Sequence, residues 1–188
     1  MLRLFEVRFH GRGGQGVVTA SRLLVEAAFI EGKWGQSIPM FGAERRGAPV
    51  QAFSRISSEP IRRHSQIYEP DVVVVFDPKI FGVVDVLHGL KKGGILIVND
   101  KRRPEELGYK GFKVGTVDAT GIAVKLGLYF AGFPAVNTAM VGAVAKATGI
   151  VSIDSVVKAI TSAWSGKLGE LNAEAAKLAY DSIVIWEG

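Results

Sequence analysis

A glycine-rich stretch near the N-terminus decides the fold: Gly11-Arg12-Gly13-Gly14-Gln15-Gly16. An apolar run over residues 4–9 precedes this glycine turn, and a run with helical periodicity over residues 17–30 follows it. Glycines at the spacing GxGxxG allow a sharp turn, let the backbone approach a ligand, and lead into a helix whose free N–H groups favour an anion. The stretch therefore predicts a Rossmann-like strand, turn and helix with a phosphate or carboxylate site at the turn.

The rest of the chain continues this alternation of strands and helices. Strands are predicted at residues 50–56, 72–76, 95–98 and 112–117, and the valine-rich second run is typical of a central parallel strand. Helices are predicted at residues 80–90, 118–127, 136–148, 153–164 and 171–182. This order predicts an α/β fold, a three-layer α/β/α sandwich around a mostly parallel sheet, with residues 1–188 forming a single domain.

A second glycine-bounded segment follows the first helix. Residues 32–49 contain four glycines and two prolines, which predicts a short strand and then a long loop. That loop reads Phe41-Gly42-Ala43-Glu44-Arg45-Arg46-Gly47. Glycine permits an unusual backbone here, and the forked guanidinium groups of Arg45 and Arg46 suit phosphate or carboxylate. We expect this loop and the glycine turn to meet at the carboxyl edge of the sheet.

Positive charge is concentrated in the first third of the chain. Residues 1–67 contain ten Lys or Arg against five Asp or Glu, whereas residues 68–188 contain thirteen of each class. This asymmetry predicts an acidic partner or an anionic ligand near the glycine turn. A basic face exposed to solvent is the alternative.

Several kinds of site are excluded by residue types that the sequence lacks. There is no cysteine, so disulfides, thiolate catalysis and thiolate ligation of zinc or iron–sulfur clusters are excluded. The three histidines lack metal-ligand spacing, and the usual hydrolase and phosphate-loop motifs are absent. We expect no catalytic residue and no metal ligand on this chain. Without a signal peptide or an apolar run of roughly 20 residues, the predicted location is the cytoplasm.

A freestanding nicotinamide- or nucleotide-binding protein is the main alternative function. Such a fold usually carries Asp or Glu about 20 residues beyond the glycine motif, where it holds the ribose. The corresponding window reads Trp34-Gly35-Gln36-Ser37 and offers neither an acid nor an arginine for a 2′-phosphate. Nicotinamide binding is therefore disfavoured, and a simple interaction domain is a further alternative.

Taken together, the glycine turn and residues 41–50 resemble the gamma subunits of 2-oxoacid:ferredoxin oxidoreductases, including the pyruvate enzyme (pyruvate synthase). Residues 68–74, 137–143 and 145–149 extend the likeness over essentially the whole chain. The resemblance implies a complex that oxidatively decarboxylates a 2-oxoacid to acyl-coenzyme A and passes electrons to ferredoxin. It implies alpha, beta and delta partners that hold thiamine diphosphate, Mg²⁺ and [4Fe–4S] clusters, while this chain binds no cofactor and has no activity alone.

The resemblance also bears on the substrate and on the site. The segment Arg46-Gly47-Ala48-Pro49-Val50 looks more like subunits that act on pyruvate or branched-chain 2-oxoacids than on 2-oxoglutarate, with aryl 2-oxoacids still open. Neither nucleic acid nor a membrane is an expected partner. The residues predicted to contact either coenzyme A or a catalytic subunit are Gly11, Arg12, Gly13, Gly14, Gln15, Gly16, Glu44, Arg45 and Arg46.

Overall fold

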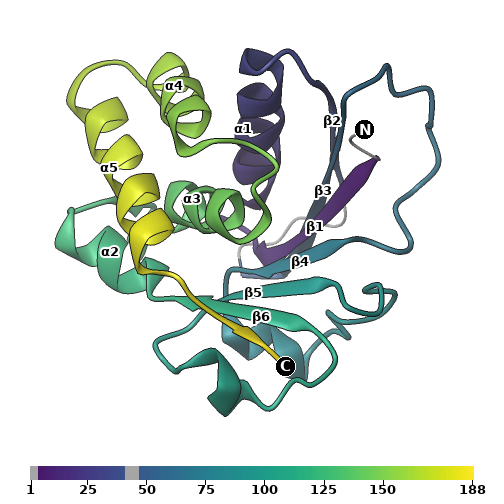
Figure 1. Cartoon of the computed structure of the whole chain (residues 1–188). Coiled ribbons are helices and arrows are strands. Elements are labelled where there is room, and N and C mark those ends of the chain that lie inside the picture. The colour runs from purple at the N-terminus through teal and green to yellow at the C-terminus, as the bar shows by residue number, and fades with distance from the viewer. Residues whose placement is uncertain (1–3, 41–46) are drawn as a thin grey trace.

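The computed structural model describes residues 4–40 and 47–188. Within them, a seven-stranded sheet with the order β2-β3-β1-β4-β5-β6-β9 forms the centre of the molecule (Figure 1). Four neighbouring strands run parallel: β1 (Phe5–Arg12), β4 (Val72–Val75), β5 (Ile95–Asn99) and β6 (Lys113–Val117). Their carboxyl ends therefore share one edge of the sheet. The predicted α/β fold with a mostly parallel sheet is confirmed.

Antiparallel strands flank this parallel centre on both sides. β3 (Pro49–Ser57) pairs with β1, and β2 (Trp34–Pro39) pairs with β3 at one edge. At the other edge the C-terminal strand β9 (Val184–Glu187), yellow in Figure 1, pairs with β6. The helical periodicity of the last third of the sequence did not predict β9.

The α-helices lie on one face of the sheet (Figure 1). They are α1 (Val17–Ile30), α2 (Ala119–Lys125), α3 (Asn137–Thr148), α4 (Ile153–Ala163) and α5 (Gly166–Ser182). The predicted helix positions agree with these bounds, although α5 begins five residues before the predicted start at residue 171. The buried side chains of α1 and α3 pack on Phe9 and its neighbours in the sheet, and this forms the larger core.

The opposite face is covered by 3-10 helices and loops. The two 3-10 helices are η1 (Pro78–Gly82) and η2 (Pro104–Leu107). They pack with Val86 and Leu90 on the second face of β4 and β5, where valine, isoleucine and leucine form a smaller core. The valine-rich run is thus buried on both faces, as predicted for a central parallel strand.

The helix predicted at residues 80–90 is wrong, and a buried arginine explains why. The side chain of Arg8 crosses from β1 and donates Nη2 hydrogen bonds to the carbonyl oxygens of Val86 (2.8 Å) and His88 (2.6 Å). A continuous helix over residues 80–90 would use the Val86 carbonyl for a hydrogen bond from the N–H of Leu90, whereas here Leu90 N–H donates to the carbonyl of Leu87 (2.9 Å). The segment therefore forms η1 followed by turns.

One small element stands apart from the main sheet. β7 (Tyr129–Phe130) and β8 (Phe133–Pro134) form a two-stranded antiparallel hairpin between α2 and α3. Two-residue strands carry too little periodicity to be recognised in a sequence.

Candidate functional site at the glycine turn

The glycine turn extends the pairing of β1 with β3 beyond the end of the sheet. The backbone N–H of Gly13 donates to the carbonyl of Ala48 (2.9 Å), and Gly47 N–H donates to the carbonyl of Gly13 (3.3 Å). Gln15 closes the turn, because its Oε1 accepts a hydrogen bond from the Arg12 backbone N–H at 2.7 Å. A polar side chain before the last glycine is therefore part of the turn itself.

Glycine is required at several positions for different reasons. Gly14 (φ 95°) and Gly16 (φ 77°) occupy the left-handed region, which other L-residues adopt at a cost. A Cβ atom at Gly11 would come too close to Val17, and one at Gly16 would collide with the side chain of Asn137. The turn is consequently packed against both α1 and the start of α3.

Two helices begin side by side at this turn. Gly16 precedes α1 and Val136 precedes α3, and neither of these two N-cap residues makes a side-chain cap hydrogen bond, although Asn137 Oδ1 accepts the N–H of Thr138 (3.0 Å). The first turns, residues 17–20 and 137–140, contain no Asp or Glu. Because the N–H groups and the helix dipole are not compensated by an acidic side chain, the potential here favours negative charge.

A cavity of about 620 Å³ opens over these helix starts. Its floor is polar, made by the glycine turn with Thr19 and Asn137, and its walls are largely apolar. Besides the turn, the lining residues are Val17, Val18, Thr19, Met40, Val50, Phe130, Ala131, Ala135, Asn137 and Trp164. Such a cavity suits an anionic group that is attached to an apolar body, or a side chain from another subunit.

Arg12 spans the place where the connections of β1 and β4 diverge to opposite faces of the sheet. Its Nε donates to Oδ2 of Asp77 (2.8 Å), which lies two residues after β4. Its Nη1 donates to the carbonyl of Gly47 (3.0 Å). Ligands of open α/β sheets bind preferentially at such a switch point. Arg12 therefore links the turn, the start of β3 and the end of β4 into one unit.

His10 lies near the end of β1 as a buried side chain. It is almost fully buried, and within residues 4–40 and 47–188 neither ring nitrogen has a hydrogen-bond partner. Burial, with a smaller effect from the nearby charge of Arg8, lowers the pKa of His10 to about 3. The ring is thus a neutral core group at physiological pH.

Comparison with known proteins identifies the family. The family model described as pyruvate ferredoxin/flavodoxin oxidoreductase matches residues 6–182. The chain belongs to this family.

Individual relatives agree with this assignment. The pyruvate/ketoisovalerate oxidoreductases common subunit gamma of Thermococcus litoralis is 55% identical over 188 residues, covering 98% of this chain and all of the relative. The pyruvate synthase subunit PorC of Methanocaldococcus jannaschii is 53% identical over 181 residues, covering 96% of this chain and 98% of the relative.

Solved structures agree as well. The crystal structure of the pyruvate oxidoreductase subunit PORC from Thermotoga maritima has a TM-score of 0.84 at 36% identity, covering 98% of this chain and 99% of that one. A 2-oxoglutarate:ferredoxin oxidoreductase from Magnetococcus marinus shares the fold, with a TM-score of 0.78 at 16% identity. There the match covers all of this chain but 32% of the longer chain.

The structure brings together the first six of the predicted site residues of this family member. Residues 11–16 form one turn at the carboxyl edge of the sheet. Glu44, Arg45 and Arg46 lie outside the described residues. The segments on either side of them do reach the site, because Met40 lines the cavity and Gly47 is hydrogen-bonded to Gly13.

Three further residues of the site were not predicted from the sequence. Asp77 could have been found, because an acid just after a buried parallel strand lies at the carboxyl edge. Asn137 starts a helix within one of the segments that carry the family resemblance, but nothing in the sequence places it against Gly16. Trp164 directly follows α4 and lines the cavity because of where α4 packs in the fold.

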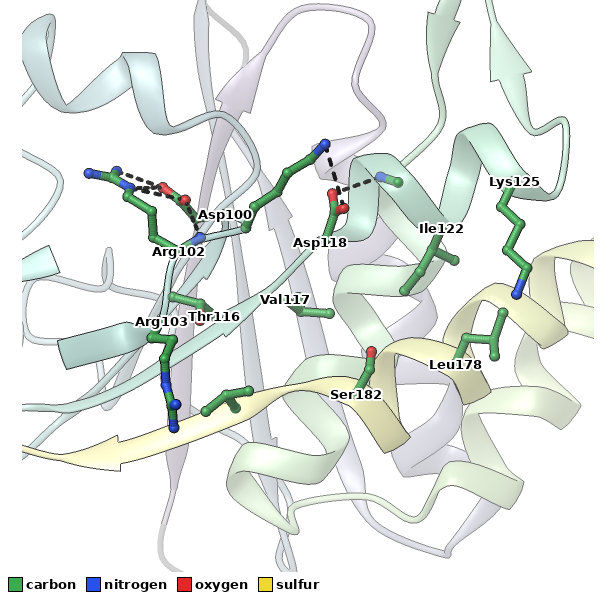
Figure 2. Close-up of a pocket in the computed structure, with 13 residues that line it drawn as sticks. Asp100, Arg102, Arg103, Thr116, Val117, Asp118, Ile122, Lys125, Leu178 and Ser182 are labelled. Atoms are coloured by element: carbon green, nitrogen blue, oxygen red, sulfur yellow. Dashed lines mark hydrogen bonds and ion pairs between the residues drawn. The ribbon is translucent and has the colours of Figure 1, made fainter. Parts of the chain in front are cut away.

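A second cavity of about 470 Å³ lies farther along the same edge, beyond β5 and β6 (Figure 2). Figure 2 shows Arg102 beside Asp100. The Nη2 atom of Arg102 lies 2.7 Å from Oδ2 of Asp100. Hydrogen bonds from Arg102 lower the pKa of Asp100. Asp118 accepts the N–H of Gly121 (2.8 Å) at the start of α2, where an anion would otherwise bind. Besides these two carboxylates, the lining contains the basic residues Lys101, Arg102, Arg103 and Lys125, so the cavity keeps an excess of positive charge.

The described residues contain no group of three or more His, Asp or Glu that could hold a metal ion. In the same part of the chain, no helix is both long enough and apolar enough to span a bilayer.

Proposed function

We propose that this chain is the gamma subunit of a pyruvate (2-oxoacid):ferredoxin oxidoreductase that acts in the cytoplasm. The complex oxidatively decarboxylates the 2-oxoacid to acyl-coenzyme A and transfers the electrons to ferredoxin. One observation carries the proposal: identity above 50% along nearly the full length of proteins named as gamma or PorC subunits. A branched-chain 2-oxoacid is a second substrate class, since the Thermococcus relative is named as common to pyruvate and ketoisovalerate oxidoreductases.

The partners in this proposal are alpha, beta and delta subunits. They hold thiamine diphosphate with Mg²⁺ and the [4Fe–4S] clusters, while coenzyme A enters as a substrate. The absence of cysteine from this chain supports placing the clusters elsewhere, because thiolates are their usual ligands. The chain contributes as a single domain and is inactive alone.

The glycine turn is the part of this chain that faces the catalytic subunits in our proposal. Its primary role is docking: the cavity offers a polar floor and apolar walls to a partner. Contact with the anionic end of coenzyme A is a second role, favoured by the two helix starts that lack acidic residues. Glu44, Arg45 and Arg46 are proposed to join this surface.

Reconstitution tests the function. Co-expression with candidate alpha, beta and delta chains should yield pyruvate-dependent and coenzyme A-dependent reduction of a viologen dye, and omission of this chain should abolish the activity. Full activity and assembly without this chain would contradict the proposal. Binding of NAD to the purified chain would instead support the nucleotide-binding alternative.

A single isosteric substitution separates the two roles of the turn. Asn137→Asp places a carboxylate on the cavity floor without changing its shape. If an anionic part of coenzyme A binds there, the KM for coenzyme A should rise about tenfold at low salt, with the KM for pyruvate and assembly unchanged. Lys92→Gln serves as the control. It changes the net charge by the same amount, but it lies in an exposed turn at the amino ends of the parallel strands. An unchanged KM for coenzyme A in Asn137→Asp would leave docking as the role.

A further inference from the structure

The β7–β8 hairpin displays aromatic side chains to solvent. The exposed fractions are 55% for Tyr129, 65% for Phe130 and 58% for Phe133. Contiguous exposed aromatic groups are uncommon on a protein that works alone, whereas tyrosine and phenylalanine are enriched where subunits meet. The hairpin thus forms an exposed aromatic surface.

The geometry of the hairpin holds these side chains in place. Its two-residue loop, Ala131 and Gly132, has φ angles of 49° and 84°, the combination of a type I′ turn. Alanine adopts a left-handed backbone only at a steric cost. At the base, Leu128 is buried and its carbonyl accepts the N–H of Ala135 at 2.9 Å. A hairpin ordered in this way loses little conformational freedom on binding.

The surroundings of the hairpin indicate the chemistry of its partner. No Asp, Glu, Lys or Arg occurs between Lys125 and Lys146. Phe130 and Ala131 also form part of the wall of the cavity beside the glycine turn, together with Met40 and Trp164. The aromatic surface is therefore continuous with the proposed docking site and requires an apolar surface opposite it.

We propose that the β7–β8 hairpin inserts into an apolar recess of a catalytic subunit of the same oxidoreductase and anchors this chain there. The identity of that partner rests on the proposed function. A second copy of this chain fits less well: each copy carries a formal net charge of +5, and the hairpin segment has no acidic residue to offset the repulsion. Insertion would seat the glycine-turn cavity against the catalytic subunit.

The test compares hairpin variants in the complete complex. In the double variant Tyr129→Thr and Phe130→Thr, the β-branched residue keeps the strand preference while removing the aromatic rings. Aromatic anchors at interfaces carry much of the binding energy, so this chain should dissociate from the complex at least about tenfold more readily. Size-exclusion chromatography over a dilution series, with native mass spectrometry, measures that dissociation. The melting temperature of the isolated variant should stay near the wild-type value, because the substituted side chains are exposed.

Trp34→Thr with Tyr68→Thr provides the matched control. Trp34 is 50% exposed at the start of β2, and Tyr68 is 69% exposed before β4. Both lie toward the amino ends of the parallel strands, away from the hairpin. Their substitution should leave assembly unchanged. Equal weakening by both pairs of substitutions would overturn the proposal, as would normal retention of the hairpin variant.

Two other outcomes identify which inference has failed. If the wild-type chain does not assemble with the oxidoreductase subunits at all, both the proposed function and the hairpin partner are wrong. If the wild-type chain assembles but the hairpin substitutions disrupt only self-association of the isolated chain, the proposed function stands and the partner is a second copy.

Discussion

Glu31 joins two helices that are distant in the sequence. It directly follows α1, and its Oε1 accepts the backbone N–H of Ser152 at the start of α4 (2.6 Å). Its Oε2 accepts a hydrogen bond from Lys33 (2.6 Å), and the same ammonium group also donates to the carbonyl of Ile150. Partial burial alone would raise the pKa of Glu31, but the hydrogen bonds from Lys33, Ser152 and Ser155 lower it to about 2.

This lowered pKa predicts a pH-dependent contribution to stability. Because the folded protein binds the Glu31 proton less tightly than the unfolded chain, the contribution is complete above pH 4.5 and is lost as the pH falls towards 2. At pH 7, Glu31→Gln should lower the free energy of unfolding by about 1 kcal/mol, a value reduced by solvent screening. Urea unfolding at several pH values measures this. Glu59→Gln, at an exposed position, is the control, and a difference that persists unchanged at pH 2 would contradict the prediction.

Substitutions at Gly14 and Gly16 separate the cost of backbone strain from the cost of a side-chain collision. Gly14→Ala imposes only left-handed strain, because the space around it is open, and should cost about 1 kcal/mol in the free energy of unfolding. Gly16→Ala adds the collision with Asn137 and should cost at least about 2 kcal/mol. Thermal or urea unfolding provides the measurement. In Gly16→Ala with Asn137→Ala, the collision is relieved, so the combined cost should be smaller than the sum of the single costs.

At the scale of elements, the packing of α3 against α5 depends on one glycine. A Cβ atom at Gly142 would overlap the backbone of Ala176, so the two helices touch there without an intervening side chain. α3 is buried along most of its length between the sheet and the other helices. The close crossing lets α3 start directly behind the glycine turn, where Asn137 meets Gly16.

The direction in which Gly142→Ala changes the free energy of unfolding tests this close crossing. In an isolated helix, alanine is favoured over glycine by about 1 kcal/mol. Gly142→Ala should nevertheless lower the free energy of unfolding by about 2 kcal/mol, because a backbone neighbour cannot move aside as a side chain can. Urea unfolding distinguishes the two signs. Lys177→Ala compared with Lys177→Gly, at an exposed position inside α5, measures helix propensity. A stabilising effect of Gly142→Ala would show that the helices can separate.

Other elements show why sequence periodicity succeeds or fails. The first strand, turn and helix are correctly predicted because glycine spacing and helical periodicity act locally. Capping also acts locally: Asp118 precedes α2, and its Oδ1 accepts the N–H of Gly121 (2.8 Å). The segment 80–90 fails because the carbonyl of Val86 accepts a hydrogen bond from Arg8, a residue 78 positions away in the sequence.

At the scale of the whole molecule, the topology brings the parts of the proposed docking surface together. β1, the glycine turn and β3 lie next to the point where the connections of β1 and β4 diverge. The same edge carries the starts of α1 and α3 and the aromatic hairpin. Anion-favouring and apolar surfaces thus lie side by side, which suits a subunit that completes a site on another chain.

The sequence by itself determined the α/β class, the sheet centre at residues 72–76, the glycine turn between the first strand and helix, and the family resemblance. These properties depend on local patterns: glycine spacing, a continuous valine run and helical periodicity. Only the tertiary structure decided which residues join the turn. Asp77, Asn137 and Trp164 come from three separate elements, and the hairpin gains its position from burial of Leu128. Because such neighbours are set by long-range packing, no local pattern encodes them.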